Sequence, residues 1–333
     1  MGDKFSKILK VKGISLFSGG LDGILAVKLI QEQGIGIEGV TFETPFFNAE
    51  KARQAADQIG IPLLVMDITE EYLTMLKAPR YGYGRNMNPC IDCHTLMLNI
   101  AGRRMEDTGA DFLFTGEVLG QRPMSQTKQS LHIVAKNSGY EEYIVRPLSA
   151  KLLPETIPEK EGKIIRQQLL DIQGRGRKRQ IELAKHYGIK NYPNPAGGCL
   201  LTDSIFSKRL RDLFEHQEDL NIRDFQLLKS GRRIRTNNNA VIIVGRNKKD
   251  NTVIQSLSVD KDIIIKMKDF PGPAVLIPDG CDEETLHFAA AVCALYSDAP
   301  NDERVIANCR VDGVSRLITI IAAKKDEVQK LTI

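Results

Sequence analysis

Long apolar runs are absent from this sequence. It contains no stretch of about 18 uninterrupted apolar residues, the length that spans a bilayer, and its first residues lead into no apolar segment like that of a signal peptide. We therefore expect a cytoplasmic protein. Disulfides are rare in that reducing compartment. If some of the six cysteines cluster, their clustering therefore indicates metal binding or catalysis.

A strong charge of one sign is also absent, since 46 Lys and Arg residues against 42 Asp and Glu residues give a formal net charge of +4. This balance permits an acidic partner such as nucleic acid without requiring one. Hydrophobic residues make up 42% of the chain and charged residues 26%, as in globular proteins. A chain of 333 residues exceeds what one hydrophobic core usually organises, so we expect two or three domains.

The first 150 residues alternate strand and helix patterns. An apolar run at 11–17 leads into the turn Ser18–Gly23. The other elements are expected as helices at 24–33 and 48–59 and as strands at 37–42, 63–67 and 112–115. This alternation predicts an α/β fold with a doubly wound parallel sheet, whose ligands bind beyond the carboxyl ends of the strands, where Ser18–Gly23 falls.

The turn Ser18–Gly23 has the composition of a phosphate-binding loop. Its glycines let backbone N–H groups approach a phosphate, and Asp22 could hold Mg²⁺ against that phosphate. The turn is neither a Walker A loop nor Gly-x-Gly-x-x-Gly, which argues against a kinase-like ATPase and a nicotinamide dehydrogenase.

The run Ser18-Gly19-Gly20-Leu21-Asp22 resembles the PP-loop of the adenylating N-type ATP pyrophosphatases. The family pattern ends in Ser where this chain has Gly23, so one hydroxyl to the pyrophosphate is missing. The resemblance implies that ATP is cleaved between its α and β phosphates to form a substrate adenylate. The residues expected to bind ATP here are Ser18, Gly19, Gly20, Asp22, Gly23 and Phe42. Asp22 is also expected to be catalytic.

A second stretch, Thr-Gly-Glu-Val-Leu-Gly-Gln-Arg-Pro-Met-Ser-Gln at 115–126, resembles the corresponding stretch of the tRNA 4-thiouridine synthetases. The resemblance implies contacts both to the nucleotide and to the activated base. The implied residues are Gly116, Glu117 and Gln121 for the nucleotide and Gln121, Ser125 and Gln126 for the base.

Three cysteines lie in segments that resemble tRNA thiouridylases. Asn88–His94 contains Cys90 and Cys93 and is similar to a segment of the 2-thiouridine synthetases. Cys199 follows Pro195-Ala196-Gly197-Gly198, where thiouridylases keep their second reactive cysteine. We expect all three cysteines to meet at one catalytic site. Cys281, Cys293 and Cys309 match no such pattern and are expected to have no chemical role, with Cys293 packing as a small hydrophobe.

Three thiolates allow three interpretations. They could ligate a [4Fe-4S] cluster whose fourth iron binds hydrosulfide, as the resemblance to iron–sulfur thiouridylases implies. Alternatively, Cys199 carries a persulfide and Cys90 or Cys93 resolves the disulfide that follows. The third interpretation is structural zinc, for which His94 is a poor fourth ligand because it directly follows Cys93. We favour the cluster.

The segment Ile164–Ile189 has a helical pattern broken at Gly174–Arg179. The glycines there would let basic side chains lie close to the phosphate backbone of tRNA. The candidate RNA-binding residues are Arg175, Arg177, Lys178 and Arg179.

Beyond residue 220 the chain changes character, with short strands such as 240–245 and 263–267 between polar turns, which predicts a small α+β domain. Its Gly245-Arg246-Asn247 turn, its Lys-Asp-Phe-Pro-Gly-Pro run at 268–273 and its closing helix resemble the RNA-binding domain of ribosome-quality-control factors. We expect Arg232, Arg233 and Arg246 to contact RNA.

These features predict a tRNA thiouridine synthetase with three regions: a PP-loop domain at 1–160, a basic region at 161–220 and an RNA-binding domain at 221–333. The expected cofactors are ATP, Mg²⁺ and a [4Fe-4S] cluster. The expected partners are tRNA and a sulfur donor, either sulfide or a cysteine desulfurase, and a homodimer is compatible with the sequence. The stretch 115–126 favours C4 of uridine over C2. The alternatives are a PP-loop nitrogen ligase, like lysidine or NAD synthetase, and a non-catalytic RNA-binding protein with a degenerate PP-loop.

Overall fold

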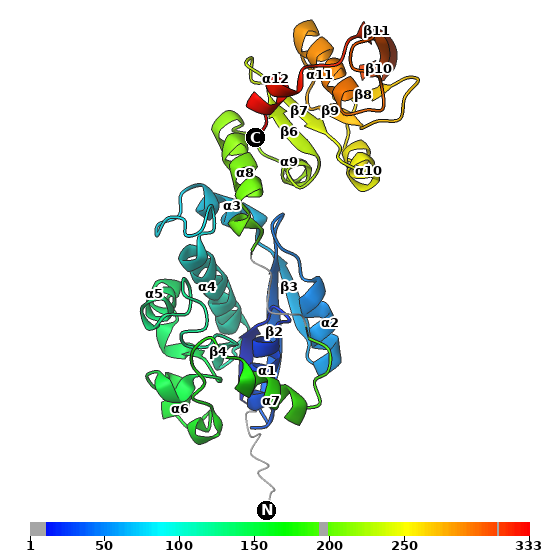
Figure 1. Ribbon diagram of the computed structural model, residues 1–333. Helices are drawn as coiled ribbons and strands as arrows, with labels where there is room; N and C mark the ends of the chain where they lie inside the picture. Colours follow the sequence, from blue (N-terminus) through cyan, green and yellow to red (C-terminus); the bar gives the residue numbers. More distant parts are fainter. Residues whose placement is uncertain (1–10, 193–198, 312) are drawn as a thin grey trace, which may run out of the picture. The chain divides into compact units, whose positions relative to one another are not determined.

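The computed structural model describes residues 11–192, 199–311 and 313–333. The chain forms two compact units, Met1–Thr202 and Asp203–Ile333, each with its own sheet (Figure 1). The division falls inside the region 161–220 that the sequence predicts as separate, and it leaves Cys199 in the same unit as Cys90 and Cys93. The run 195–198 before Cys199 lies outside the described residues.

The first unit is built on a five-stranded sheet in the order β3-β2-β1-β4-β5. Every neighbouring pair is parallel, so the predicted doubly wound parallel sheet is confirmed. The strands are β1 (Lys12–Leu16), β2 (Gly36–Glu43), β3 (Leu63–Asp67), β4 (Phe112–Thr115) and β5 (Ile144–Val145).

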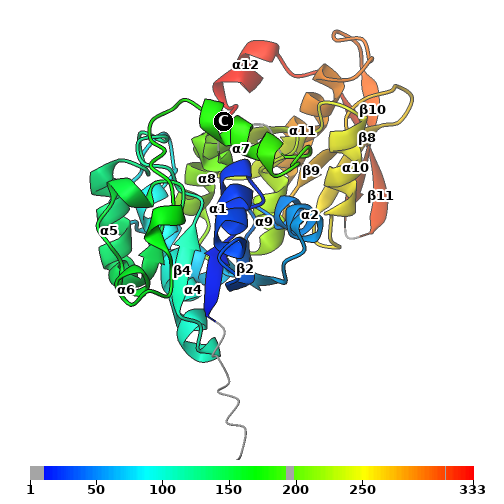
Figure 2. The same ribbon diagram turned by 90° about the horizontal axis from the view of Figure 1, so that it is seen from below.

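Helices cover both faces of this sheet (Figure 2). The helices α1 (Leu21–Gln31), α2 (Glu50–Ile59) and α7 (Lys178–His186) share one core with the strands, and the long helix α4 (Cys90–Thr108) packs with α5 (Lys128–Ser138) on the other face. Helix α1 is buried almost all round, because α7 covers the side that the sheet does not. The remaining helices are α3 (Thr69–Lys77), α6 (Ile157–Lys160) and short 3₁₀ turns at Glu141–Tyr143, Ala150–Leu152, Arg166–Gln168 and Leu200–Thr202. Among the described residues, none of the helices has the length and apolar composition of a membrane-spanning segment.

Two parts of the first unit differ from the sequence pattern. The helical pattern predicted over Ile164–Ile189 is wrong for its first half, which holds only the 3₁₀ turn and irregular backbone before α7. Its apolar residues, such as Ile164 and Leu169, are buried in the core that α1, α2 and α7 share with the sheet, although they do not lie on a helix. The sequence pattern does not predict helix α4, because polar residues and Gly102 interrupt its apolar positions.

The second unit is a six-stranded antiparallel sheet in the order β11-β10-β8-β9-β7-β6. The strands are β6 (Arg232–Arg235), β7 (Val241–Val244), β8 (Ile263–Met267), β9 (Val275–Ile277), β10 (Val305–Val311) and β11 (Val314–Ile320). The helices are α8 (Ser204–His216), α9 (Ile222–Leu227), α10 (Lys248–Ser256), α11 (Glu283–Leu295) and α12 (Lys325–Lys330). The predicted smaller α+β domain is therefore confirmed.

Both faces of the central strands of this second sheet are covered, which explains the continuous apolar runs of β7 and β9. Side chains alternate between the faces, so Ile263 and Ile265 pack into the core with α11, whereas Ile264 packs with α9 and α10. Cys293 of α11 and Cys309 of β10 lie fully buried in the first of these cores, where they pack as small hydrophobes.

The glycine turn of the first unit depends on one backbone conformation. Gly19 has φ +74°, in the left-handed region, and a Cβ atom there would lie 2.3 Å from the carbonyl oxygen of Lys51 in α2. The turn between β1 and α1 can therefore pass beside α2 only with glycine at this position.

Gly19→Ala tests this constraint against Gly34→Ala, because Gly34 has nearly the same φ of +73° and nothing within 4 Å of the place that a Cβ atom would take. The left-handed backbone alone should lower the free energy of unfolding by about 1–2 kcal/mol in Gly34→Ala. The clash should lower it further by roughly 1–3 kcal/mol in Gly19→Ala. Urea unfolding followed by circular dichroism measures the difference, and equal losses in the two variants would contradict the steric account.

Candidate functional site

The glycine turn lies at the switch point of the first sheet. The last residue of β1, Leu16, pairs with Val40 of β2 on one side and with Thr115 of β4 on the other. The order β3-β2-β1-β4-β5 reverses direction between β1 and β4, which is where open α/β sheets form their ligand crevice. The loops that follow β1 and β4 therefore begin side by side.

Helix α1 begins directly after this turn. Gly20 precedes the helix in extended backbone (φ −75°, ψ 157°), and no side chain caps the helix start. The first N–H groups of α1 have no intrahelical acceptor and carry the positive end of the helix dipole, as a phosphate site requires. Ser18 is exposed at the mouth of the turn.

The loop after β4 packs directly on this helix start. A Cβ atom on Gly116 would lie 2.4 Å from the backbone N of Gly23 and 2.5 Å from the backbone C of Asp22. The expected nucleotide residues of the two loops thus touch. Gly23 itself has room for a side chain, since its Cβ would meet only ring carbons of Phe17 at 3.6 and 3.8 Å.

Asp22 is held from the other loop by a chain of amides. Its Oδ2 accepts a 2.7 Å hydrogen bond from Gln121, whose Oε1 accepts a 2.9 Å hydrogen bond from Gln180 of α7. Burial raises the pKa of Asp22, while Gln121, Arg177 and Arg122 lower it. The other oxygen, Oδ1, is buried without a partner among the described residues, which suits a cation or a cation-bound water.

Glu117 has a different position from the one expected for a nucleotide contact. It is 6% exposed, and its carboxylate accepts a 2.9 Å hydrogen bond from Arg146 Nε and lies 3.1 Å from His94 Nδ1. Burial alone would raise the pKa of Glu117, but Arg146 and His94 together lower it to about 2. Glu117 therefore ties the loop after β4 to α4 immediately beside Cys93.

Cys90 and Cys93 occupy the first turn of α4, three residues apart and so on one face of the helix. The segment that carries Cys199 docks against the loop that leads into this helix. Met87 N donates to Leu201 O at 3.1 Å, and Asn86 Nδ2 donates to Thr202 O at 2.7 Å. These contacts bring Cys199 toward the other two thiols, although it is about 110 residues later in sequence.

The three thiols influence one another and the buried Tyr72 of α3. Burial raises the pKa of Cys93 to about 12, with Cys199 and Cys90 adding to the rise. The pKa of the half-buried Cys90 is also raised by burial, and that of Cys199 is raised by the surrounding protein although its surface is exposed to solvent. The Tyr72 hydroxyl interacts with Cys93, but no hydrogen bond of good geometry joins it to a partner among the described residues. Without a ligand, all three sulfurs are thus protonated at neutral pH.

Arg122 links the phosphate site to the sulfur site. It is exposed in the loop after β4, and burial raises the pKa of Asp22 and of Cys90 while the charge of Arg122 opposes both rises. The loop after β4 thus contacts both the glycine turn, through Gly116 and Gln121, and the first turn of α4, through Glu117. Within the described ranges no three His, Cys, Asp or Glu side chains are already arranged to hold a metal ion.

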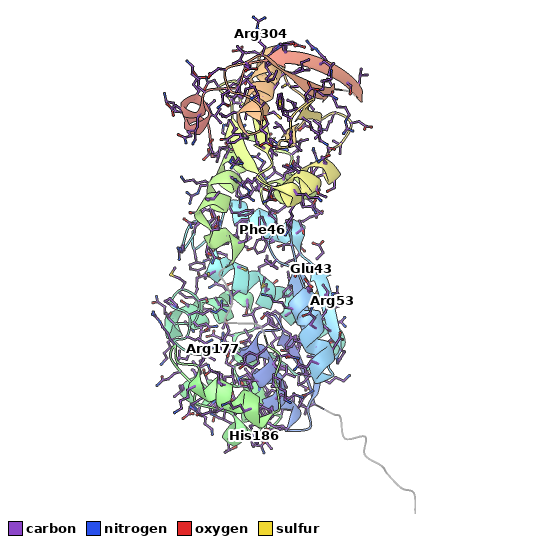
Figure 3. All side chains as sticks on the ribbon, turned by 45° about the vertical axis from the view of Figure 1, so that its right-hand side comes forward. Glu43, Phe46, Arg53, Arg177, His186 and Arg304 are labelled. Atoms are coloured by element: carbon purple, nitrogen blue, oxygen red, sulfur yellow. The ribbon has the colours of Figure 1, made fainter. Side chains whose placement is uncertain are left out.

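The other expected site residues are dispersed. Phe42 is buried at the end of β2, 5% exposed, and Ser125 and Gln126 are buried in the loop after β4. Arg175, Lys178 and Arg179 are exposed, and Arg179 pairs with Asp171 at 2.7 Å. Arg177 is half-buried at the start of α7, opposite His186 at its end (Figure 3).

The basic residues of the second unit also differ in exposure. Arg246 is exposed and bonded to Asp250 at 2.6 Å. Arg232 lies over the ring of Tyr296, with 4.5 Å between its guanidinium carbon and the ring centroid. Arg233 is 5% exposed beside Asp212, and burial lowers its pKa to about 10.

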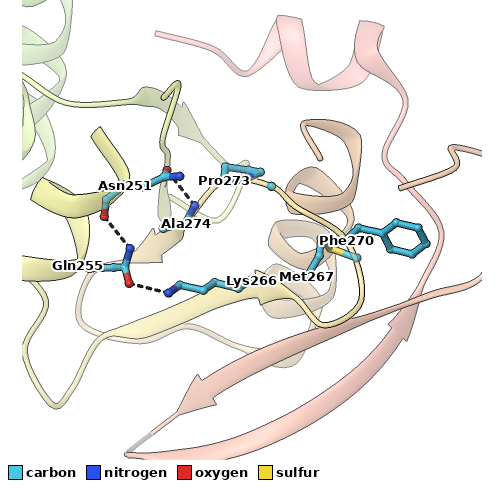
Figure 4. A pocket seen from close by; sticks show the side chains of 8 residues that line it. Asn251, Gln255, Lys266, Met267, Phe270, Pro273 and Ala274 are labelled. Atoms are coloured by element: carbon cyan, nitrogen blue, oxygen red, sulfur yellow. Dashed lines mark hydrogen bonds between the residues drawn. The ribbon is translucent and has the colours of Figure 1, made fainter. Parts of the chain in front are cut away.

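A cavity of about 180 Å³ lies between α10, β8 and the loop before β9 (Figure 4). Its polar groups bond to one another. Lys266 donates to Gln255 at 2.6 Å, and the backbone N of Ala274 donates to Asn251 at 3.0 Å, while the ring of Phe270 points away from both amides. The cavity includes none of the expected RNA-binding residues.

Several residues at the first site are missed by sequence reasoning. Gln180, Arg146 and Tyr72 belong to none of the motifs described above, and Arg122 lies in the stretch 115–126 but is assigned no role there. Their spacing from the glycine turn and the cysteines is large, and only tertiary contacts reveal them. A polar Gln on the buried side of a short amphipathic helix is the one local signal for Gln180.

Two family models match the chain. Residues 9–152 match the family described as thiamine biosynthesis protein (ThiI), and residues 231–332 match the NFACT protein RNA binding domain. The first match includes the glycine turn, Cys90, Cys93 and the stretch 115–126, whereas Cys199 lies outside both matches. The two matches confirm both resemblances, of the first unit to PP-loop thiouridine synthetases and of the second to the RNA-binding domain of ribosome-quality-control factors.

Three solved structures are similar to parts of the chain. A predicted subunit of tRNA methyltransferase from Methanocaldococcus jannaschii is 15% identical, with a TM-score of 0.32, over 41% of this chain and 67% of that chain. The C-terminal part of the fibronectin/fibrinogen-binding protein from Streptococcus suis is 12% identical, with a TM-score of 0.29, over 73% and 94%. NMN synthetase from Francisella tularensis is 12% identical, with a TM-score of 0.28, over 56% and 90%. Likeness at this level carries no argument about function.

Glu117→Gln should destabilise the first unit at neutral pH by about 3–5 kcal/mol, because it leaves Arg146 buried without its counter-charge. Glu38→Gln is the matched control, since the pair of Glu38 with Arg104 is far more exposed and should contribute less than about 1 kcal/mol. Chemical unfolding at pH 7 measures both.

The same variant should flatten the acid limb of the stability curve. The pKa of Glu117 is lowered from its usual 4.5 to about 2, so its contribution is complete above pH 4.5 and is lost as the pH falls to 2. Across that window the native protein should lose roughly 3 kcal/mol more than Glu117→Gln. Parallel curves for the two proteins would show that the ion pair does not depress this pKa.

Proposed function

We propose, from the pairing of a ThiI-family domain with an NFACT RNA-binding domain in one chain, that this protein is an ATP-dependent tRNA sulfurtransferase. The first unit adenylates a uridine of tRNA and replaces its oxygen with sulfur, and the second unit binds the RNA. The stretch 115–126 favours 4-thiouridine as the product.

The observation that carries this proposal is the meeting of a phosphate-binding turn and three thiols in one unit. The stretch 115–126 contacts the turn through Gly116 and Gln121, and it contacts the first turn of α4, which carries Cys90 and Cys93, through Glu117 and His94. A nitrogen ligase needs the turn but not the thiols, so the convergence favours sulfur transfer.

The first step uses the turn. The carbonyl oxygen of uridine attacks the α-phosphate of ATP, and pyrophosphate leaves. The N–H groups at the start of α1 bind phosphate oxygens, and the unpaired Oδ1 of Asp22 fits Mg²⁺ or its water. This step converts a poor leaving oxygen into part of AMP, which leaves readily.

In the second step, sulfide sulfur adds to the activated carbon, and AMP leaves with the former uridine oxygen. Arg122 belongs to the same loop as Gln121, which bonds to Asp22, and we assign its exposed guanidinium to the adenylate phosphate. Because a paired base cannot reach this site, the uridine leaves its stack, at an energy of a few kcal/mol offset by phosphate contacts.

The donor set fits an iron–sulfur cluster better than a persulfide. Burial raises the pKa of Cys90, Cys93 and Cys199, which opposes a free reactive thiolate, whereas a metal replaces the thiol protons directly. Cys90, Cys93 and Cys199 would hold a [4Fe-4S] cluster, which supplies an iron without a protein ligand for sulfide. Zinc is disfavoured, because His94 directly follows Cys93 and two neighbouring side chains seldom both reach one tetrahedral ion.

The second unit supplies the RNA contact in this proposal. Arg246 is exposed at the start of α10, followed by the exposed Lys248 and Lys249. We assign phosphate contacts to this segment and to Arg232, whereas the interior position of Arg233 suits a structural role.

The proposal is tested with anaerobically reconstituted protein, ATP, Mg²⁺, sulfide and a tRNA transcript. Thiouridine should form and be detected by nucleoside mass spectrometry. This activity should fall at least about tenfold in each of the variants Cys90→Ser, Cys93→Ser and Cys199→Ser, because each would remove a cluster ligand. Cys281→Ser, in the other unit, is the control and should keep full activity.

Pyrophosphate release separates the alternatives. The cysteine variants should still release pyrophosphate, since adenylation uses no thiol. A triple cysteine variant with full activity on its tRNA would favour a nitrogen ligase. Native protein that releases no pyrophosphate with any tRNA would indicate an RNA-binding protein with a degenerate turn.

Arg246→Gln should weaken tRNA binding several-fold and lower the slope of log Kd against log salt by roughly 0.9, the value for one lost phosphate contact. Lys261→Gln is the matched control, since Lys261 is likewise exposed and paired with an aspartate, Asp279, at another place on the unit. Filter binding over a salt series measures both, and an unchanged slope in Arg246→Gln would remove Arg246 from the interface.

A further inference from the structure

The segment before α7 is fixed to the loop that follows β4. Gly174 N donates to Leu119 O at 2.7 Å, and Leu119 N donates to Ser149 Oγ at 2.9 Å. The same hydroxyl donates to Ile172 O at 2.6 Å. The basic segment is therefore held by its backbone at the edge of the nucleotide site, and it is not an independent surface loop.

Helix α7 also runs parallel to α1. At one end Gln180 connects through Gln121 to Asp22, and at the other end Tyr187 donates a 2.9 Å hydrogen bond to Glu32. Ala184 lies in the same core as the buried face of α1. The two helices thus begin at the same end of the unit, and both positive ends are directed toward the glycine turn.

Three buried polar atoms at this place lack hydrogen-bond partners among the described residues. They are Arg177 Nε, Gln180 Oε1 and Asp22 Oδ1. Buried polar groups are nearly always paired, so three unpaired atoms around one hydrogen-bonded chain indicate a missing ligand. The set offers a cationic donor and two acceptors, which match a phosphate and the water shell of its Mg²⁺.

The four basic residues of the run 175–179 do not form a single surface. Arg175, Lys178 and Arg179 are exposed to solvent, whereas Arg177 is half-buried. The charge of Arg177 is close enough to lower the pKa of Asp22. Arg177 also precedes Gln180 by three residues, about one helical turn, and its Nε is buried, which places it on the side of α7 that reaches Asp22 through Gln121.

We propose that Arg177 binds the β and γ phosphates of magnesium-bound ATP, with Gln180 positioning Asp22 through Gln121, so that α7 completes the nucleotide site. The inference rests on the proposed function only for the binding of ATP at the glycine turn. It moves Arg177 from the RNA-binding group to the ATP site and leaves the other three cations facing solvent.

This assignment gives the site a charge that its turn lacks. Gly23 offers no hydroxyl where the related turns have serine, so the pyrophosphate has one contact fewer. A guanidinium makes paired, charge-assisted hydrogen bonds to phosphate oxygens. Such bonds strengthen as charge develops on the leaving pyrophosphate.

The test measures binding of α,β-methylene-ATP with Mg²⁺ by equilibrium dialysis, and of AMP in parallel. Arg177→Gln should weaken the triphosphate analogue about tenfold or more, with little change for AMP. Arg175→Gln and Lys178→Gln are matched controls from the same segment and should leave both affinities unchanged. Arg177→Lys should recover part of the lost affinity, because lysine keeps the positive charge but lacks the planar guanidinium with its paired donors. Circular dichroism confirms folding.

Each result has one meaning. The inference is overturned if Arg177→Gln loses affinity for AMP and for the analogue equally. It is also overturned if Arg177→Gln binds the analogue as tightly as the native protein does. Neither result contradicts adenylation. A loss of tRNA affinity without a loss of nucleotide affinity also overturns the inference. A loss of affinity for the analogue without a loss of affinity for AMP supports the inference, even if no thiouridine forms in the sulfur-transfer assay. Native protein that binds no nucleotide would overturn both proposals.

Discussion

The tight contact between Gly116 and the first turn of α1 is the constraint on which the first unit depends. A parallel sheet directs all its carboxyl ends to one edge, and β1 and β4 are neighbours there. With no side chain at Gly116, the loop after β4 lies against the backbone of Asp22 and Gly23. One short stretch can then reach the turn, α7 and α4 at once.

That stretch couples two chemical environments. Gln121 bonds to Asp22 at the phosphate end, and Glu117, four residues earlier, bonds to Arg146 and faces His94 beside Cys93. A buried ion pair contributes little net stability, but it fixes geometry, since breaking it leaves an unpaired charge in the interior. The loop is therefore fixed both at the glycine turn and at the start of α4.

Charge is distributed unevenly across this region. On the phosphate side burial raises the pKa of Asp22, and the charges of Arg177 and Arg122 oppose that rise. On the sulfur side burial dominates and holds the thiols protonated. The first environment suits a polyanion, and the second suits a soft metal that displaces protons. In the second unit a charged side chain also enters the interior, since Arg233 of β6 is buried beside Asp212.

The sequence by itself determined the elements whose cause is local. Continuous apolar runs bounded by turn residues predicted β1 to β4 and the sheet they form, and the Ser18–Asp22 turn and the Cys90–Cys93 pair were visible as short motifs. Only the tertiary structure decided which side chains of the irregular segments face inward. Arg175 and Arg177 are two residues apart and alike in sequence, yet the hydrogen bond from Gly174 to Leu119 and the packing of α7 on α1 turn only one toward Asp22. The burial of Arg233, the pairing of Glu117 with Arg146 and the docking of Cys199 near α4 have the same origin. They depend on contacts between residues far apart in the chain, which leave no pattern in the local sequence.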